Sequence, residues 1–174
     1  MTQAHIALLV LRVAVGSMII MHGVAHITKR GKLTIAGTAR WFGSMGMRYP
    51  MVQAWTASIT ELGGGALLIS GLFTSLGAAG VLGVMLVAWI IAHRRNGFFI
   101  YNAGQGWEYV AILCAVALTI GTLGPGKYSI DHAIDLTWYT GWTGLCVTLL
   151  GALGALVLLA TCWRPPAPAA PAAK

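Results

Sequence analysis

Charged side chains are scarce in this sequence. Only 9% of the 174 residues are Asp, Glu, Lys or Arg, where a soluble domain carries roughly 25%. Hydrophobic residues make up 57% of the chain, and the mean hydropathy is +0.78. The apolar residues form blocks long enough to cross a bilayer. These features exclude an ordinary soluble domain and predict an integral membrane protein.

Acidic residues are the rarest charged type. Four Asp and Glu stand against eleven Lys and Arg, which gives a formal net charge of +7. In a soluble protein such an excess would indicate a nucleic-acid partner. In a membrane protein it indicates topology instead. We therefore expect membrane lipids as partners, and no nucleic acid.

Several chemical motifs are also missing. Cys114, Cys146 and Cys162 lie in apolar stretches, and their spacing is that of neither a redox nor a zinc motif. We expect three buried thiols and no disulfide framework. No haem, flavin, NAD or iron–sulfur fingerprint is present. The first residues lack the basic region of a removable signal peptide, so we expect the first apolar block to be retained.

The apolar blocks predict an all-α, polytopic membrane fold with five spans. The spans cover residues 6–27, 51–73, 76–92, 107–123 and 138–163. We expect a four-helix transmembrane bundle over residues 1–136, a fifth C-terminal transmembrane helix within 137–164, and a Pro/Ala-rich cytoplasmic tail over 165–174.

Two connections between the spans have distinctive sequences. A short turn over residues 74–77 predicts an antiparallel hairpin of the second and third spans. Residues 34–47 mix aromatic side chains and methionines with Arg40 and glycines. This segment is either a short amphipathic helix lying in the membrane interface or an irregular loop.

Basic residues predict the orientation, because Lys and Arg concentrate in short cytoplasmic loops. On one side of the predicted spans, Lys127 is the only basic residue. The other side carries Lys29, Arg30, Lys32, Arg40, Arg48, Arg94, Arg95, Arg164 and Lys174. The prediction is an outside N-terminus and a cytoplasmic C-terminus.

Ionisable side chains inside the spans are expensive in lipid, so each should be paired, hydrated or used. The candidate ligand or proton site consists of Arg12, His22, His26, Glu61, His93 and Glu108. Depth along the helices predicts an ion pair of Arg12 with Glu61, which serves either packing alone or a proton or substrate pathway. Gly16 and Gly23 predict close contact between the first span and the glycines at 63–65.

The predicted cytoplasmic side carries two further patterns. His22 and His26 are four residues apart and could bind a metal with His93 and Glu108, but we favour hydrogen bonding and expect no metal. The loop 94–109 is rich in aromatic residues and glycine. It forms either an aromatic belt or a pocket for a quinone ring. The candidate quinone or lipid contacts are Asn96, Phe98, Trp107 and Tyr109, with His93 or Glu108 as hydrogen-bond partner.

Four strings of residues resemble the DoxX family of small bacterial membrane proteins. They are Arg12…Gly16…His22-Gly23, Glu61-Leu62-Gly63-Gly64…Gly71-Leu72, Asn96-Gly97-Phe98-Phe99…Gly106-Trp107-Glu108-Tyr109 and Gly124-Pro125-Gly126-Lys127-Tyr128-Ser129-Ile130-Asp131. The resemblance runs from about Leu9 to Asp131. Two features depart from it: His26 stands where such proteins often have Lys, and the fifth span is additional to the family core.

The resemblance implies a four-helix bundle in the bacterial plasma (inner) membrane, with members linked to oxidoreductase assemblies such as a thiosulfate:quinone oxidoreductase. Three functions remain open. In the first, the chain is a subunit of a quinone-linked redox complex, and a partner supplies the electrons. In the second, it is a non-catalytic membrane anchor or accessory subunit, and the small residues of the fifth span pack on another protein or a second copy. In the third, it is a small transporter or lipid-binding protein that uses Arg12 and Glu61.

Overall fold

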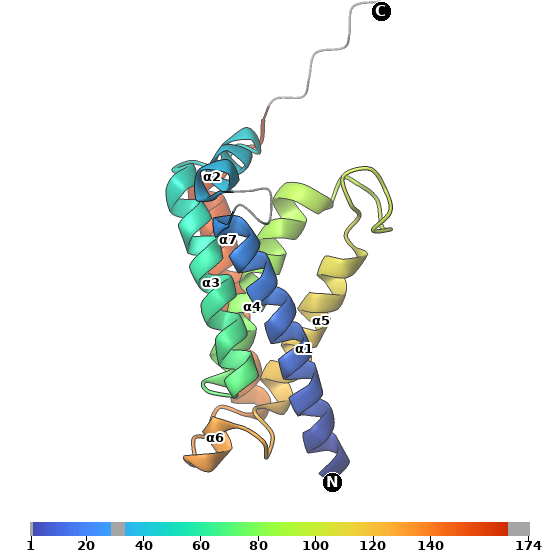
Figure 1. The fold of residues 1–174 in the computed structure, drawn as a ribbon, viewed down its shortest axis with the longest axis vertical. Helices are drawn as coiled ribbons and strands as arrows, with labels where there is room; N and C mark the ends of the chain where they lie inside the picture. Colours follow the sequence, from blue (N-terminus) through green and yellow to red (C-terminus); the bar gives the residue numbers. More distant parts are fainter. Residues whose placement is uncertain (1, 29–33, 167–174) are drawn as a thin grey trace, which may run out of the picture.

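The computed structural model describes residues 2–28 and 34–166, and these fold into a bundle of helices (Figure 1). The elements are α1 (Thr2–Ile27), α2 (Ile35–Ser44), α3 (Pro50–Ser70), α4 (Thr74–Ala88), a π-helical turn η2 (Trp89–His93) that continues α4, α5 (Glu108–Leu123), α6 (Ile130–Ala133) and α7 (Gly141–Cys162). The predicted all-α class is confirmed.

Three helices are long and apolar enough to cross a membrane: α1, α4 together with η2, and α7. Helix α5 is apolar but shorter, with 16 residues. Helix α3 has 21 residues, but it carries Gln53, Ser58 and Glu61 and does not reach the apolarity of the other three. The structure therefore confirms a membrane protein with three candidate spans among the described residues.

Glycines hold α1 against α3, as predicted. A Cβ built on Gly16 would lie 2.7 Å from the carbonyl oxygen of Gly65, and one built on Gly65 would lie 2.6 Å from that of Gly16. The two backbones thus touch, which only glycine allows. The neighbouring glycines differ: Gly64 faces the backbone of Gly77 on α4, and a Cβ on Gly63 would meet no atom within 4 Å.

Helix α7 packs against α4 and α5 inside the same chain. A Cβ on Gly151 would lie 1.9 Å from the Ala79 carbonyl oxygen, and one on Gly144 would lie 2.2 Å from that of Gly121. These glycines are therefore used within the bundle rather than against a partner. Burial of all three thiols is not confirmed, because Cys114 and Cys162 are half-buried and Cys146 is exposed.

The hairpin of α3 and α4 is present, but the predicted turn is displaced. Residues 74–77 form the first turn of α4, and the chain reverses at Gly71, whose φ of +66° ends α3. Helix α4 begins earlier because the Asp131 carboxylate accepts hydrogen bonds from the backbone N–H groups of Phe73 (2.7 Å) and Thr74 (2.9 Å). A residue distant in sequence thus caps this helix.

The segment after α1 contains the helix that the sequence left open. Thr34 caps α2 by accepting a hydrogen bond from the Gly37 N–H at 3.2 Å. Phe42 of α2 is buried and packs with Met47 and with Ala54 of α3. The Trp163 indole N–H donates to the Met45 carbonyl at 2.9 Å. Helix α2 is thereby fixed to both α3 and the end of α7.

The bundle has two distinct ends: α1 begins at one of them, and α7 ends at the other (Figure 1). The α2 end comprises α2, the loop 94–107 and the last turn of α7. The α6 end comprises the start of α1, the turn 71–73 and α6. At the α2 end lie Arg40, Arg48, Arg94, Arg95 and Arg164, whereas Lys127 lies at the α6 end. Lys29, Arg30, Lys32, Lys174 and tail residues 167–174 lie outside the described residues.

Candidate functional site

A half-open cavity of ≈ 1040 Å³ lies between the helices, and its lining runs from Leu76 in the first turn of α4 to His93 at the α2 end. Its wall is built from α1, α2, α3, α4 with η2, the loop 94–107, α5 and α7. Most lining side chains are apolar. The polar lining residues are His22, His26, Gln53, Thr56, Thr60, Glu61, His93, Asn96, Gln105 and Tyr109. A large apolar pocket with a few polar groups is the usual form of a small-molecule site.

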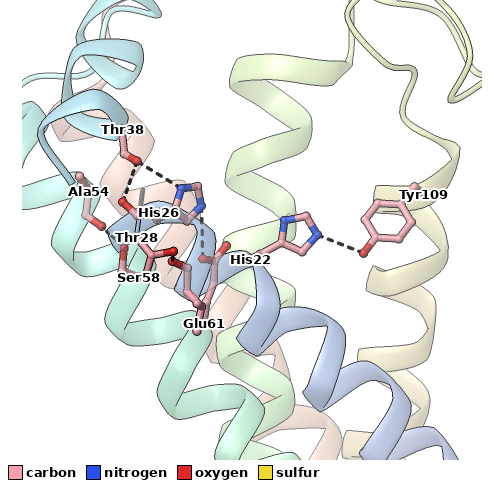
Figure 2. Close-up of polar contacts among 9 residues, drawn as sticks. His22, His26, Thr28, Thr38, Ala54, Ser58, Glu61 and Tyr109 are labelled. Carbon is pink, nitrogen blue, oxygen red and sulfur yellow. Dashed lines mark hydrogen bonds and ion pairs between the residues drawn. The ribbon is translucent and has the colours of Figure 1, made fainter. Parts of the chain in front are cut away.

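A half-buried histidine of α1 and a buried glutamate of α3 meet in this cavity. His26 Nε2 lies 3.3 Å from Glu61 Oε2, and the two side chains are 15% and 5% exposed. Figure 2 shows His26 between Glu61 and Thr38 of α2. The Thr38 hydroxyl lies 3.4 Å from His26 Nδ1 and donates to the His26 carbonyl at 3.1 Å. Three helices therefore orient one imidazole ring.

A second polar contact joins α1 to α5. His22 Nε2 lies 3.4 Å from the Tyr109 hydroxyl (Figure 2), and both residues line the same cavity, with His22 exposed. The two rings are 6.2 Å apart, centroid to centroid. Because His22 and His26 are one helical turn apart, α1 presents both imidazoles to the same cavity.

The predicted ion pair of Arg12 with Glu61 is wrong. Arg12 donates to the carbonyl of Tyr128 at the α6 end, and its guanidinium lies over Gly71. The contact of Gly16 with Gly65 fixes the register of α1 and α3, so Arg12 lies opposite Gly71, about ten residues or roughly 15 Å from the level of Glu61. The sequence estimate of depth had placed these two residues too close together.

The remaining candidates divide into two groups. His93 and Asn96 line the cavity, where His93 Nδ1 donates to the Gln105 carbonyl at 2.9 Å. Glu108, Phe98 and Trp107 lie outside its lining. The Glu108 carboxylate accepts from the Ile100 N–H at 3.1 Å, and the Phe98 and Trp107 rings pack edge to face, with centroids 4.8 Å apart. These three residues organise the loop.

Within residues 2–28 and 34–166, no three His, Cys, Asp or Glu side chains come together in a way that could hold a metal ion.

Sequence reasoning missed Thr38, because a threonine in a short helix carries no signal of what it faces. It also missed the cap formed by Asp131, although this residue closes the fourth family-like string.

Residues 7–94 match the sequence profile of the DoxX family, which is slightly more than half of the chain. The matched segment covers α1 to η2, including His22, His26 and Glu61, and stops before Tyr109. Comparisons with curated proteins and with solved structures gave no match. The match over more than half of its length shows that the chain belongs to the DoxX family.

Proposed function

We propose that this chain is a subunit of a quinone-linked redox complex in the bacterial plasma membrane, and that its cavity binds the quinone ring beside Glu61. The observation that carries the proposal is the buried pair of His26 and Glu61 in the wall of a cavity large enough for a ligand. Reduction of a quinone to a quinol requires electrons and protons together. This site offers a group that can supply the protons.

The hydrogen bonds of His26 support a proton held by this pair. The Thr38 hydroxyl has one proton and donates it to a carbonyl, so it accepts from His26 Nδ1–H. A neutral His26 of this tautomer would present the Nε2 lone pair to the Glu61 carboxylate. The contact is attractive only when one further proton resides on Nε2 or on the carboxyl group. We infer that the pair can hold a proton next to the cavity.

The second pair supplies a further hydrogen-bond donor to the cavity. The Tyr109 hydroxyl and His22 lie on helices different from the one that carries Glu61. A quinone ring bound between Glu61 and the Tyr109 hydroxyl would have a polar contact to each of them, which suits its two opposite oxygens. The electrons would come from a partner protein, since the sequence holds no flavin, haem or iron–sulfur motif.

The membrane topology that accompanies this proposal has five spans, with α3 and α5 in addition to the three candidates. Helix α5 has 16 residues and is about 24 Å long, short of the usual hydrocarbon thickness of roughly 30 Å. Helix α3 is long enough and packs between α1 and α4. An odd number of spans agrees with α1 beginning and α7 ending at opposite ends of the bundle (Figure 1). The arginines of the α2 end favour a cytoplasmic C-terminus.

The packing of the helices bears differently on the other two functions. The transporter hypothesis relied on Arg12 and Glu61 forming a gate, and these residues do not meet. The anchor hypothesis relied on small residues of α7 facing a partner, namely Gly144, Gly151, Gly154 and Ala155. Gly144 and Gly151 face the chain's own α5 and α4, whereas Gly154 is exposed and remains free for such a contact.

Matched Glu→Gln variants test the proposal. The purified full chain in lipid nanodiscs is titrated with a tail-less benzoquinone, and Glu61→Gln is compared with Glu108→Gln. We expect Glu61→Gln to weaken binding about tenfold, because it removes a charge-assisted hydrogen-bonding group from the cavity. Glu108→Gln should bind as the unaltered chain does. Equal affinities of all three proteins, or no binding to the unaltered chain, would refute the proposal.

A further inference from the structure

One part of the cavity is a groove between α3 and α7, and α4 forms its floor. On this floor, Gly80 faces Thr60 of α3, and Gly83 faces Gly151 of α7. Toward the α6 end, the groove is lined by apolar side chains of all three helices, namely Leu67, Leu76, Val147 and Leu150. This part of the groove offers only hydrocarbon contacts to whatever occupies it.

Toward the α2 end, α3 presents polar side chains to the cavity. Gln53, Thr56 and Thr60 line it and lie within about 60° of one another around the helix. Elsewhere on α3, the Ser58 and Ser70 hydroxyls each donate to the carbonyl four residues earlier, at 2.8 Å. The hydroxyls of Thr56 and Thr60 and the amide of Gln53 make no hydrogen bond among the described residues, although Gln53 is only 7% exposed. Unpaired polar groups are costly in a membrane, so this row points to a ligand that accepts hydrogen bonds.

Three arginines stand above this polar row, where the two walls of the groove meet at the α2 end. Met47, just before α3, forms an antiparallel bridge with Trp163, just after α7. Arg48 and Arg164 donate backbone N–H groups across this bridge, at 2.7 and 2.9 Å. The Arg94 guanidinium lies over the Trp163 ring, 5.5 Å from its centroid. These three arginines, the arginine patch, are exposed, and within the described part of the chain none forms an ion pair with a carboxylate.

We propose that the groove binds one anionic phospholipid from the leaflet at the α2 end. Its phosphate lies at the arginine patch, because guanidinium groups bind phosphate through charge-assisted hydrogen bonds. Its ester carbonyls accept hydrogen bonds from Gln53, Thr56 and Thr60, and one acyl chain follows the apolar part of the groove. A phospholipid has the same order of phosphate, ester and hydrocarbon as the groove has of arginines, polar row and apolar lining.

The length of the groove fits one acyl chain. Thr56 and Leu67 both line it and are eleven residues apart on α3, or about 16 Å. One leaflet contributes half of a hydrocarbon thickness of roughly 30 Å. Glu61 instead contacts His26 of α1, so the lipid leaves that pair to another ligand. The proposal therefore does not rest on quinone binding.

The test measures binding of phosphatidylglycerol to the purified full chain. The chain is delipidated in detergent and titrated with the lipid, and native mass spectrometry counts the bound molecules. The charge variant combines Arg48→Gln with Arg164→Gln. Its control combines Arg40→Gln with Arg95→Gln, which removes the same charge from exposed positions outside the patch.

A second variant tests the polar row independently of charge. It combines Thr56→Val with Thr60→Val, which keeps the shape of both side chains and removes their hydroxyls. The control combines Thr119→Val with Thr122→Val on α5, whose hydroxyls donate to carbonyls of their own helix at 2.9 and 2.7 Å. Because the two variants address different parts of the lipid, either one decides the test if the other does not fold.

We expect one phosphatidylglycerol bound to the unaltered chain. The charge variant should weaken binding about tenfold and the threonine variant about threefold, while both controls bind as the unaltered chain does. Equal affinity of all these proteins, or no lipid bound to the unaltered chain, would overturn the proposal and leave the proposed function intact.

Two other occupants of the groove have their own outcomes. Inorganic phosphate that displaces the lipid at millimolar concentration would assign the arginine patch to a free anion and overturn the role of the acyl chain. A dimer of the unaltered chain that excludes the lipid, and that is lost in the threonine variant, would assign the groove to a second copy. Either result would overturn the phospholipid site.

Discussion

The two ends of this bundle both bury ionisable groups, but they do so in different ways. At the α6 end, Arg12 and Asp131 are 0% exposed, and the Asp131 carboxylate accepts hydrogen bonds of 2.7 to 2.9 Å from Phe73 and Thr74. At the α2 end, the contacts of His26 with Glu61 and of His22 with Tyr109 are 3.3 and 3.4 Å long. The first set is short and enclosed, whereas the second lines a cavity.

The difference follows from what each charge touches. Asp131 replaces the missing partners of a helix N-terminus, and the backbone N–H groups there stabilise its negative charge. Arg12 donates to a backbone carbonyl, and its guanidinium occupies the space over Gly71. Glu61 faces an imidazole and open volume instead. A buried charge that satisfies backbone groups builds the fold, and one that faces a cavity is available to a ligand.

The largest effect should come from removing the charge at the α6 end. Asp131→Asn should lower the free energy of unfolding by about 3 kcal/mol, because it weakens the cap of α4 and leaves Arg12 buried without a nearby counter-charge. Asp135→Asn, at an exposed position, should change it by less than about 0.5 kcal/mol. Denaturant unfolding in detergent micelles measures both. Similar values for the two variants would show that the α6 end is not structural.

A smaller effect is expected between the two ends, where α7 meets α4. Gly151→Ala should destabilise the chain by about 2 kcal/mol, because its Cβ would lie 1.9 Å from the Ala79 carbonyl oxygen and the helices must separate. Gly154→Ala should leave stability unchanged or raise it, since that Cβ enters open space. Thermal unfolding of the two variants measures both changes in stability. If Gly154→Ala were the more destabilising variant, Gly154 would not face open space in the cavity wall.

At the α2 end, stability and binding should separate. Glu61→Gln should change the free energy of unfolding by no more than about 1 kcal/mol, because an amide keeps the shape and can still hydrogen-bond to His26. The same variant should weaken quinone binding about tenfold. Parallel unfolding and binding measurements on one preparation give both values. A loss of stability as large as that of Asp131→Asn would make Glu61 a structural residue and remove the contrast between the ends.

The smallest expected effect concerns the second polar contact. Tyr109→Phe removes a hydroxyl that lies 3.4 Å from His22 and should change stability by less than about 0.5 kcal/mol. Binding of the tail-less ring should weaken about threefold, in line with one long hydrogen bond. Tyr101→Phe, an exposed ring of the loop, is the control. An unchanged affinity would place the ring on the Glu61 side of the cavity alone.

The sequence predicted the helices well because hydropathy and turn residues act locally. The contact of α1 with α3 was also predictable, since Gly16 and Gly65 are where backbones can touch. The partner of Arg12 was not, because depth counted along separate helices ignores the register that this contact imposes. The turn at Gly71 was displaced by a cap from Asp131, which lies sixty residues away. The cavity itself depends on the packing of several helices, which no local pattern records.

The central claim is that the α2 end binds a quinone, and the native occupant of the cavity tests it most directly. The chain and its Glu61→Gln and Glu108→Gln variants are purified in native lipid particles, and bound quinone is extracted and quantified by mass spectrometry. We expect quinone equimolar with protein in the unaltered chain and in Glu108→Gln, and a clearly smaller amount in Glu61→Gln. Folded, unaltered protein without quinone, or equal quinone in all three preparations, would contradict it.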